Sequence, residues 1–264
     1  MIEITFPDGA SRSYKIHSTP YDIASSISEG LARNVISAKF NDKAIETSTE
    51  LVENGNLIFY TWNDPEGKKA FWHSSAHVLA QVLEEFYSGI KLTIGPAISN
   101  GFYYDVDFGN HTMSEKDFPK IEKRMIEISR KKCLFELKSI SKKEALGFYK
   151  KQGNEYKIEL IDNLKDGTIS FCNHDNFTDL CRGGHLPNTG FIKAVKLLSV
   201  AGAYWRADQS KTQLTRVYGI SFPKQKELNE YLELIEEAKK RDHRKLGKQL
   251  ELFTFSNKVG QGLP

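Results

Sequence analysis

The sequence predicts an α+β protein built from two folded parts and a C-terminal helix. Residues 1–62 combine short strands with one helix, and residues 63–224 mix helical periodicity with glycine-bounded strands. Residues 225–241 then repeat apolar side chains at helical spacing before a basic run. We therefore expect a small module, a larger α+β domain and a linker helix.

The first part starts with a hairpin signal, because residues 2–6 alternate apolar and polar side chains and Pro7-Asp8-Gly9 supplies a turn. Thr19 and Pro20 form an N-cap pair that predicts a short helix ending near Gly30. Further strands are expected around residues 35–40 and 56–60, with turns at Asn41-Asp42 and Asn54-Gly55. This order predicts a β-grasp, ubiquitin-like module, although a generic α+β module without its own function fits equally well.

The second part is expected to follow a linker at residues 63–69. Helices are predicted over residues 71–86, from a capping box at 114–117, and from another at 141–144. Strand signals dominate residues 92–107 and 156–219. The domain should therefore combine a sheet with a few helices.

Composition limits the class of protein. The 264 residues are 39% hydrophobic and 27% charged, with a net charge of +3, which suits about two globular domains and does not by itself indicate nucleic-acid binding. The N-terminus lacks signal-peptide features, and no apolar run approaches the ~20 residues of a membrane span. Three cysteines are too few for a disulfide framework, so we expect a cytoplasmic protein with reduced thiols.

Two histidines stand out on the helix predicted over residues 71–86. His73 and His77 are four residues apart and share a face with Ala80 and Glu84, whereas the apolar side chains gather on the opposite face. The apolar stripe therefore anchors the helix and leaves the imidazoles free. A functional pair and a pair of exposed surface histidines both fit this pattern.

A loop about a hundred residues later provides the complementary groups. Cys181 and His185 flank two glycines, which disfavour a helix and predict a tight loop. Together with the histidine helix they make three imidazoles and one thiol, a set that suits tetrahedral zinc. The same groups could instead activate water without a metal, with Asp179 orienting a base. Cys133 and Cys172 are expected to be small apolar side chains.

Several long motifs, in this order, resemble bacterial threonyl-tRNA synthetases: HSSAH, IGPAISNGFYYDVD, TDLCRGGH, AGAYWRAD and RDHRKLGK. By this resemblance, residues 1–62 are the TGS module, 63–224 the editing domain and 225–241 the linker helix. Residues 242–264 would be a truncated start of the class II aminoacylation domain. The resemblance implies that this chain cannot charge tRNA, and that ATP and zinc serve only the missing domain.

The activity implied is proofreading, the hydrolysis of the ester in seryl-tRNA(Thr) by activated water. His73 would position or activate water, while Cys181 and His185 would line the reacting ester. The other residues carried over by motif are His77 in the hydrolytic cluster and Tyr104, Lys157 and Asp179 at the substrate. Lys157 would orient the terminal ribose or polarise charge, and Asp179 would bind the amine or hydroxyl of serine.

The chain departs from the family pattern at Gly183-Gly184, where many bacterial relatives carry Gly-Pro. The related alanyl-tRNA synthetase editing domain uses similar histidine and cysteine motifs with zinc, whereas threonyl editing sites are generally described without a required metal. We therefore expect no cofactor for editing. If zinc is present, His73, His77, Cys181 and His185 would hold it.

Two other functions fit the sequence: a freestanding trans-editing deacylase, and a non-catalytic appendage that binds tRNA. The expected partner is tRNA(Thr) mischarged with serine, with no membrane partner. The full-length protein is expected to be a homodimer and this stretch alone a monomer.

Overall fold

The computed structural model describes residues 1–241, 246–247 and 250. The chain divides into two compact units, Met1–Pro223 and Lys224–Pro264. Helices and separate sheets confirm the predicted α+β class. Within the described residues, none of the helices has both the length and the apolar character that crossing a bilayer requires.

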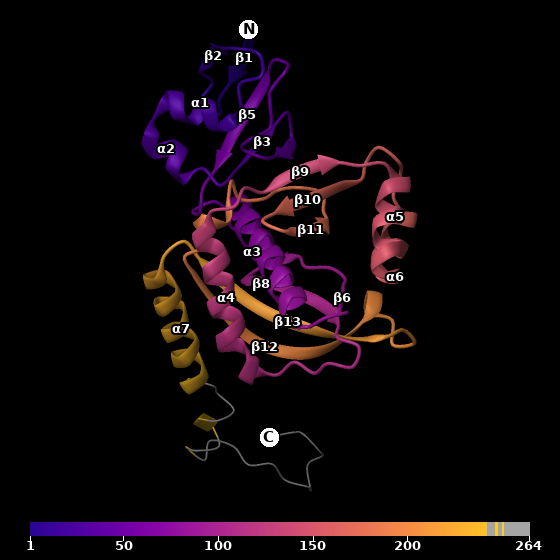
Figure 1. Cartoon of the computed structure of the whole chain (residues 1–264). Coiled ribbons are helices and arrows are strands. Elements are labelled where there is room, and N and C mark those ends of the chain that lie inside the picture. The colour runs from indigo at the N-terminus through magenta and orange to yellow at the C-terminus, as the bar shows by residue number, and fades with distance from the viewer. Residues whose placement is uncertain (242–245, 248–249, 251–264) are drawn as a thin grey trace, which may run out of the picture. The chain divides into compact units, whose positions relative to one another are not determined.

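The first part of unit 1 is a five-stranded sheet with the order β2-β1-β5-β3-β4 (Figure 1). Its strands are β1 (Ile2–Thr5), β2 (Ser11–Tyr14), β3 (Ser37–Phe40), β4 (Lys43–Ile45) and β5 (Gly55–Tyr60), and its helices are α1 (Pro20–Ile27) and α2 (Glu29–Asn34). The first and last strands pair in parallel at the centre, and the remaining pairs are antiparallel. This arrangement agrees with the predicted β-grasp module.

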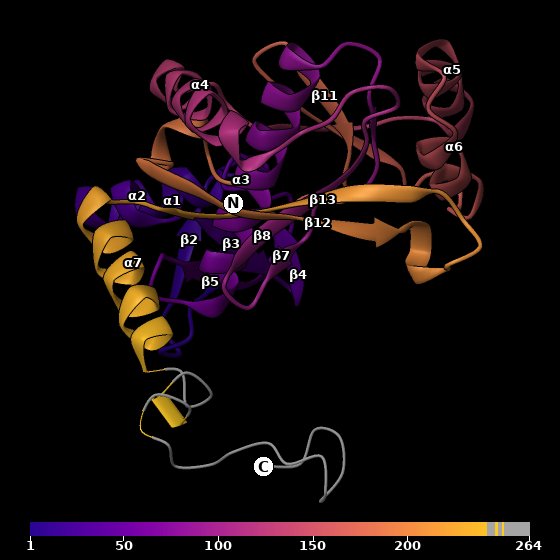
Figure 2. The ribbon, with the colours of Figure 1, turned by 90° about the horizontal axis from the view of Figure 1, so that it is seen from below.

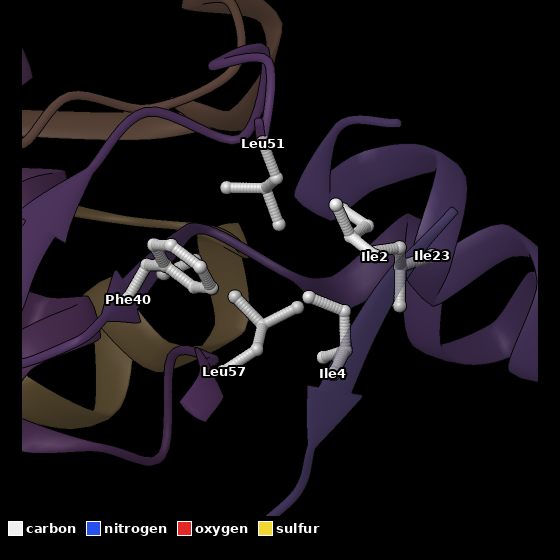
Figure 3. Close-up of a cluster of buried hydrophobic side chains, with 7 residues drawn as sticks. Ile2, Ile4, Ile23, Phe40, Leu51 and Leu57 are labelled. Carbon is white, nitrogen blue, oxygen red and sulfur yellow. The ribbon is translucent and has the colours of Figure 1, made fainter. Parts of the chain in front are cut away.

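The core of this module forms where α1 crosses the sheet. Figure 3 shows Ile2 and Ile4 of β1 meeting Ile23 of α1, together with Leu57 of β5. All four side chains are buried. Because removing apolar surface from water is the main driving force for folding, this contact between helix and sheet is what stabilises the module.

Local sequence chemistry explains the ends of these elements. Thr19 and Asp22 cap each other at the start of α1, as the Thr19-Pro20 pair predicts. Asn41 and Asp42 both have positive φ, at +45° and +65°, and join β3 to β4 in a two-residue turn. A second helix, α2, occupies the region where the first helix was expected to end.

The segment predicted as a linker is mostly helix. Helix α3 (Pro65–Phe86) begins at Pro65, directly after the module's last strand. At Gly67, a Cβ atom would lie only 1.8 Å from the carbonyl oxygen of Thr61, so the helix start packs tightly on the end of the module. The expectation of a separate linker at residues 63–69 is therefore wrong, because the backbone there is packed rather than extended.

The rest of unit 1 contains two sheets. One has the order β12-β13-β8-β6, with β7 beside β8, and the other has the order β11-β10-β9. Their strands are β6 (Lys91–Leu92), β7 (Ala97–Ile98), β8 (Gly101–Asp107), β9 (Glu136–Ser139), β10 (Ser170–His174), β11 (Phe177–Leu180), β12 (Ala194–Tyr204) and β13 (Gln213–Phe222).

Helices cover one face of the larger sheet. Figure 2 shows α3 and α4 (Phe118–Lys131) on the same side of β13 and β12, and α3 also contacts β8. Helix α5 (Lys142–Gln152) starts at the predicted capping box of Ser141 and Glu144. Helix α6 (Glu155–Asp162) was not expected, because residues 156–219 carried mostly strand signals.

Unit 2 contains helix α7 (Gln225–Lys240), which lies inside the predicted segment 225–241. The assignment of residues 242–264 to an aminoacylation domain falls almost wholly outside the described residues. The predicted domain boundaries stay predictions.

Candidate functional site

Helix α3 carries both histidines of the predicted site. His77 is buried, with 3% of its surface exposed, and His73 is half-buried. Their ring centroids are 4.7 Å apart. Because neither imidazole projects freely into solvent, the alternative of two exposed surface histidines is wrong.

The loop after β11 brings the thiol to this helix. The Nε2 atom of His73 lies 2.9 Å from Sγ of Cys181, and Nε2 of His185 lies 3.2 Å from the same sulfur. The rings of His73 and His185 stack with centroids 4.9 Å apart. The thiol is therefore held between two imidazoles, one from each of the two motifs singled out in the sequence.

The serines of the HSSAH motif position this loop, although sequence reasoning assigned them no role. The backbone N–H of Leu186 donates to Oγ of Ser74 over 2.8 Å. Ser75 shares a hydrogen bond of 2.7 Å with Ser221 of β13, and the ring nitrogen of Trp72 donates to the Ser221 carbonyl. The hydroxyl of Ser74 thus joins α3 to the loop, and that of Ser75 joins α3 to the sheet. The position of both serines between His73 and His77 in the sequence could have indicated such a role.

Glu46 also contacts this site, although the sequence carried no signal for it. It follows strand β4 of the β-grasp module and is 6% exposed, yet its carboxylate contacts the Cys181–His185 loop. Its Oε1 lies 2.9 Å from Nδ1 of His185 and accepts a hydrogen bond of 3.0 Å from the Gly184 backbone N–H. The site therefore contains a group from each part of unit 1.

A second cluster surrounds Asp179 at the end of β11. Lys157 of α6 donates to its Oδ1 over 2.5 Å, and Tyr104 of β8 donates to its Oδ2 over 2.6 Å. Tyr149 of α5 donates to Oδ1 over 3.3 Å. His77 connects the two clusters, because its Nδ1 lies 3.5 Å from Oδ2 of Asp179. All seven predicted site residues thus meet in one region.

Cys181 and the imidazoles of His73, His77 and His185 form what we call the thiol cluster. Burial and neighbouring charges set its protonation. Burial alone would raise the pKa of Cys181, but His73, His77 and the hydrogen bond from His185 outweigh it and hold that pKa well below its ordinary value. Burial also opposes charge on His185. Its hydrogen bonds with Cys172, Cys181 and Glu46 overcome this and raise its pKa well above the usual range. These opposite shifts favour a thiolate on Cys181 and a proton on His185.

The neighbouring groups respond differently. The pKa of His77 is lowered, chiefly by burial, which favours its neutral ring. Burial raises the pKa of Asp179, but the charge of Lys157 together with the contacts from His77 and Tyr104 outweighs it, and the net shift is downward. Burial and the Asp179 charge raise the pKa of Tyr104 well above its usual value. Asp179 is thus an ionised carboxylate beside a protonated phenol.

A cleft of about 990 Å³ opens onto both clusters and is lined by both parts of unit 1. His73, His77 and Cys181 line it, and so do Asp179, Tyr104 and Lys157. The β-grasp side contributes Lys39. His185 does not line the cleft and is fully buried, so it would act on an ester through Cys181.

The thiol cluster could also bind a metal ion. One donor atom from each of His73, His77, Cys181 and His185 lies within 4.8 Å of every other. Tetrahedral zinc would need donor separations of roughly 3.3–3.8 Å, so small side-chain movements would complete such a site. Neither ring nitrogen of His77 has a hydrogen-bond partner among the described residues, so this ring could donate to an ion.

Two regions of the chain match known domain families. Residues 2–59 match the TGS domain, and residues 169–218 match the second additional domain of threonyl and alanyl tRNA synthetases. Threonine–tRNA ligases of Flavobacterium psychrophilum and Flavobacterium johnsoniae are each 67% identical over all 264 residues, which is 40% of their length. The ligase of Cytophaga hutchinsonii is 56% identical over the whole chain and 41% of its own length.

Proposed function

Since this chain belongs along its whole length to the threonyl-tRNA synthetase family, and spans about 40% of its relatives, we propose that it hydrolyses the ester of mischarged seryl-tRNA(Thr). The observation that carries the proposal is the thiol held between two imidazoles, beside the buried Asp179–Lys157 pair, at a cleft. We further infer that the whole protein attaches threonine to tRNA(Thr) with ATP.

The small chemical difference between serine and threonine explains why a separate editing site is needed. Serine lacks one methyl group of threonine, and such a difference yields only ~1 to 3 kcal/mol of discrimination in a binding pocket. A second site that admits serine and rejects the extra methyl by steric clash adds the missing selectivity. Tyr104 and Lys157 crowd the Asp179 end of the cleft and are suited to such exclusion.

The thiol cluster would handle the attacking water. His73 lines the cleft with its Nε2 beside Cys181, so it can position the water in front of the ester. The Cys181 thiolate, stabilised by His185, can hold that water by accepting a hydrogen bond. Direct attack by the thiolate is the alternative: a thioester between Cys181 and serine would form as the ester C–O bond breaks and the terminal ribose leaves as its protonated hydroxyl, and water would then hydrolyse the thioester and return the thiol.

The Asp179 cluster would hold the substrate. Oδ1 of Asp179 accepts hydrogen bonds from Lys157, Tyr149 and the Leu180 backbone, whereas Oδ2 accepts one, from Tyr104, among the described residues. A carboxylate oxygen has two acceptor sites, so Oδ2 can take the ammonium group of serine. Lys157, held by the carboxylate, would orient the terminal ribose.

We propose that editing does not require a metal. When bound by His73, His77, Cys181 and His185, zinc would act as a Lewis acid toward the ester carbonyl. Without zinc, the hydrogen bonds from His73 and His185 to the Cys181 sulfur can hold the thiolate in place to bind the attacking water.

A deacylation assay separates this function from its rivals. We expect the chain to release serine from seryl-tRNA(Thr) and to leave threonyl-tRNA(Thr) intact, and His73→Ala to slow release by about 10²–10⁴-fold. His17→Ala, at an exposed histidine of the β-grasp module, is the matched control.

Binding of tRNA without hydrolysis would support a non-catalytic appendage. Editing in trans on tRNA that the full-length ligase has charged would support a freestanding deacylase. Partners beyond tRNA, including a homodimer of the full-length protein, stay predictions.

A further inference from the structure

We propose that Glu46 of the β-grasp module is a positioning residue of the hydrolytic site, which is therefore complete only when that module is docked. The inference rests on the proposed function for its catalytic consequence. Glu46 lies within the stretch that matches the TGS domain, and His185 lies within the stretch that matches the second additional domain. Their contact joins residues 139 positions apart in the sequence.

The Glu46 carboxylate binds three donors of one loop. Its Oε1 accepts from the Gly184 backbone N–H over 3.0 Å and faces Nδ1 of His185 at 2.9 Å. Its Oε2 accepts from the His185 backbone N–H over 3.1 Å. A carboxylate as buried as this one is costly unless it is fully hydrogen-bonded, and this loop provides the donors.

The shape of the loop is suited to this carboxylate. Gly183 and Gly184 have φ of +98° and +86°, a region that favours glycine, and the turn they make aims two successive N–H groups at Glu46. A Cβ atom at Gly183 would lie 2.9 Å from a methyl carbon of Leu137 and 3.3 Å from Oε1 of Glu46. The glycine pair noted in the sequence therefore permits the close approach of the module.

The contact determines what the His185 ring presents to the thiol. With Nδ1–H donated to Glu46, the other ring nitrogen, Nε2, is the atom directed at Sγ of Cys181, 3.2 Å away. A carboxylate behind a histidine fixes the orientation of the ring and keeps its Nδ1 protonated. Glu46 thus acts on the ester through His185 and Cys181, without touching the substrate.

Backbone hydrogen bonds within the module hold Glu46 in place. The carbonyl oxygen of Glu46 accepts from the Thr49 backbone N–H, and the carbonyl oxygen of Thr47 accepts from the backbone N–H of Tyr21 at the start of α1. Thr47 is buried as well. The carboxylate is therefore placed by the fold of the β-grasp module, and the module contributes to hydrolysis as well as to the cleft wall.

Glu46→Gln tests the proposal in the full 264-residue chain, because glutamine keeps the size but replaces one acceptor oxygen by a donor amide. We expect the rate constant for serine release to fall about 10- to 100-fold with KM within about twofold. The ring ¹⁵N signals of His185 should shift as its Nδ1–H loses the carboxylate. Glu50→Gln is the matched control, since Glu50 is an exposed glutamate of the same module.

Two outcomes would overturn the proposal. One is a Glu46→Gln chain that matches Glu50→Gln in both the rate of release and the His185 ring signals. The other, which needs no variant and holds even if Glu46→Gln fails to fold, is a wild-type spectrum in which Nδ1 of His185 carries no proton. If the wild-type chain releases no serine, the hydrolytic function fails, and the ring signals still decide whether Glu46 positions His185.

Discussion

Nε2 of His73 lies 2.9 Å from Sγ of Cys181, although 108 residues separate them in the sequence. One residue comes from the helix that starts at the end of the β-grasp module, and the other from the loop that follows β11. This contact joins the two motifs on which the prediction of a site depended.

The lowered pKa of Cys181 predicts unusual thiol reactivity. Because the thiolate persists below the ordinary range, its alkylation by iodoacetamide should stay nearly constant from about pH 8.5 to about pH 7, where an ordinary thiol loses about tenfold in rate per pH unit. Cys172 should stay unmodified in the native chain, since it is fully buried and its pKa is raised to about 11. Mass spectrometry of wild type and Cys181→Ser locates the adduct, and an ordinary pH dependence at Cys181 would contradict the thiolate.

The Asp179–Lys157 pair should behave as a buried ion pair. Asp179→Asn removes one charge and leaves the Lys157 ammonium unpaired, so we expect a loss of about 3–5 kcal/mol in the free energy of unfolding. Asp179→Asn combined with Lys157→Met should recover at least half of that loss. Glu155→Gln, which breaks the more exposed pair with Lys91, should cost at most about 1 kcal/mol. Urea unfolding measures all of these, and a double variant no better than Asp179→Asn would argue against the pairing.

His174 should make the chain less stable in mild acid. Burial lowers its pKa to about 3, against 6.5 for an ordinary histidine, so between these values the unfolded chain binds more protons than the folded one. Stability from this residue is complete above 6.5 and is lost as the pH falls towards 3, by up to about 1.4 kcal/mol per pH unit.

His174→Phe is the corresponding test. Neither ring nitrogen of His174 has a hydrogen-bond partner among the described residues, and the ring packs against Phe135 and Phe177, so phenylalanine suits the site. We expect the stability lost between about pH 7 and about pH 5 to shrink by about 2 kcal/mol in the variant. His17→Phe, at an exposed position, should leave that loss unchanged. Equal losses in both variants would refute the prediction.

Chelation tests whether a metal is required. We expect chain treated with a strong chelator to release serine at a rate within about twofold of the untreated chain. Cobalt added to the treated chain should give a thiolate charge-transfer band that Cys181→Ser removes, because the donor set can hold a tetrahedral ion. If hydrolysis disappears on chelation and returns with zinc, the metal-free proposal is wrong.

Much of the fold follows from short stretches of sequence. The capping box of Thr19 and Asp22 and the positive-φ turn at Asn41-Asp42 each depend on residues within four positions of one another. Such signals predicted the β-grasp order correctly. They failed at residues 63–69, where packing of Gly67 against Thr61 lets the helix begin without a linker, and at α6, whose residues lacked a clear helical pattern.

Residue types and spacing along the chain were thus enough to mark His73, His77, Cys181 and His185 as candidate site residues, because helix and loop geometry are local. The neutral ring of His77, the thiolate of Cys181 and the contribution of Glu46 depended on how the two parts of unit 1 pack. Burial and charge at close range shift a pKa, and both arise from segments distant in sequence. The sequence pattern around Glu46 does not indicate that its carboxylate contacts His185, 139 residues away.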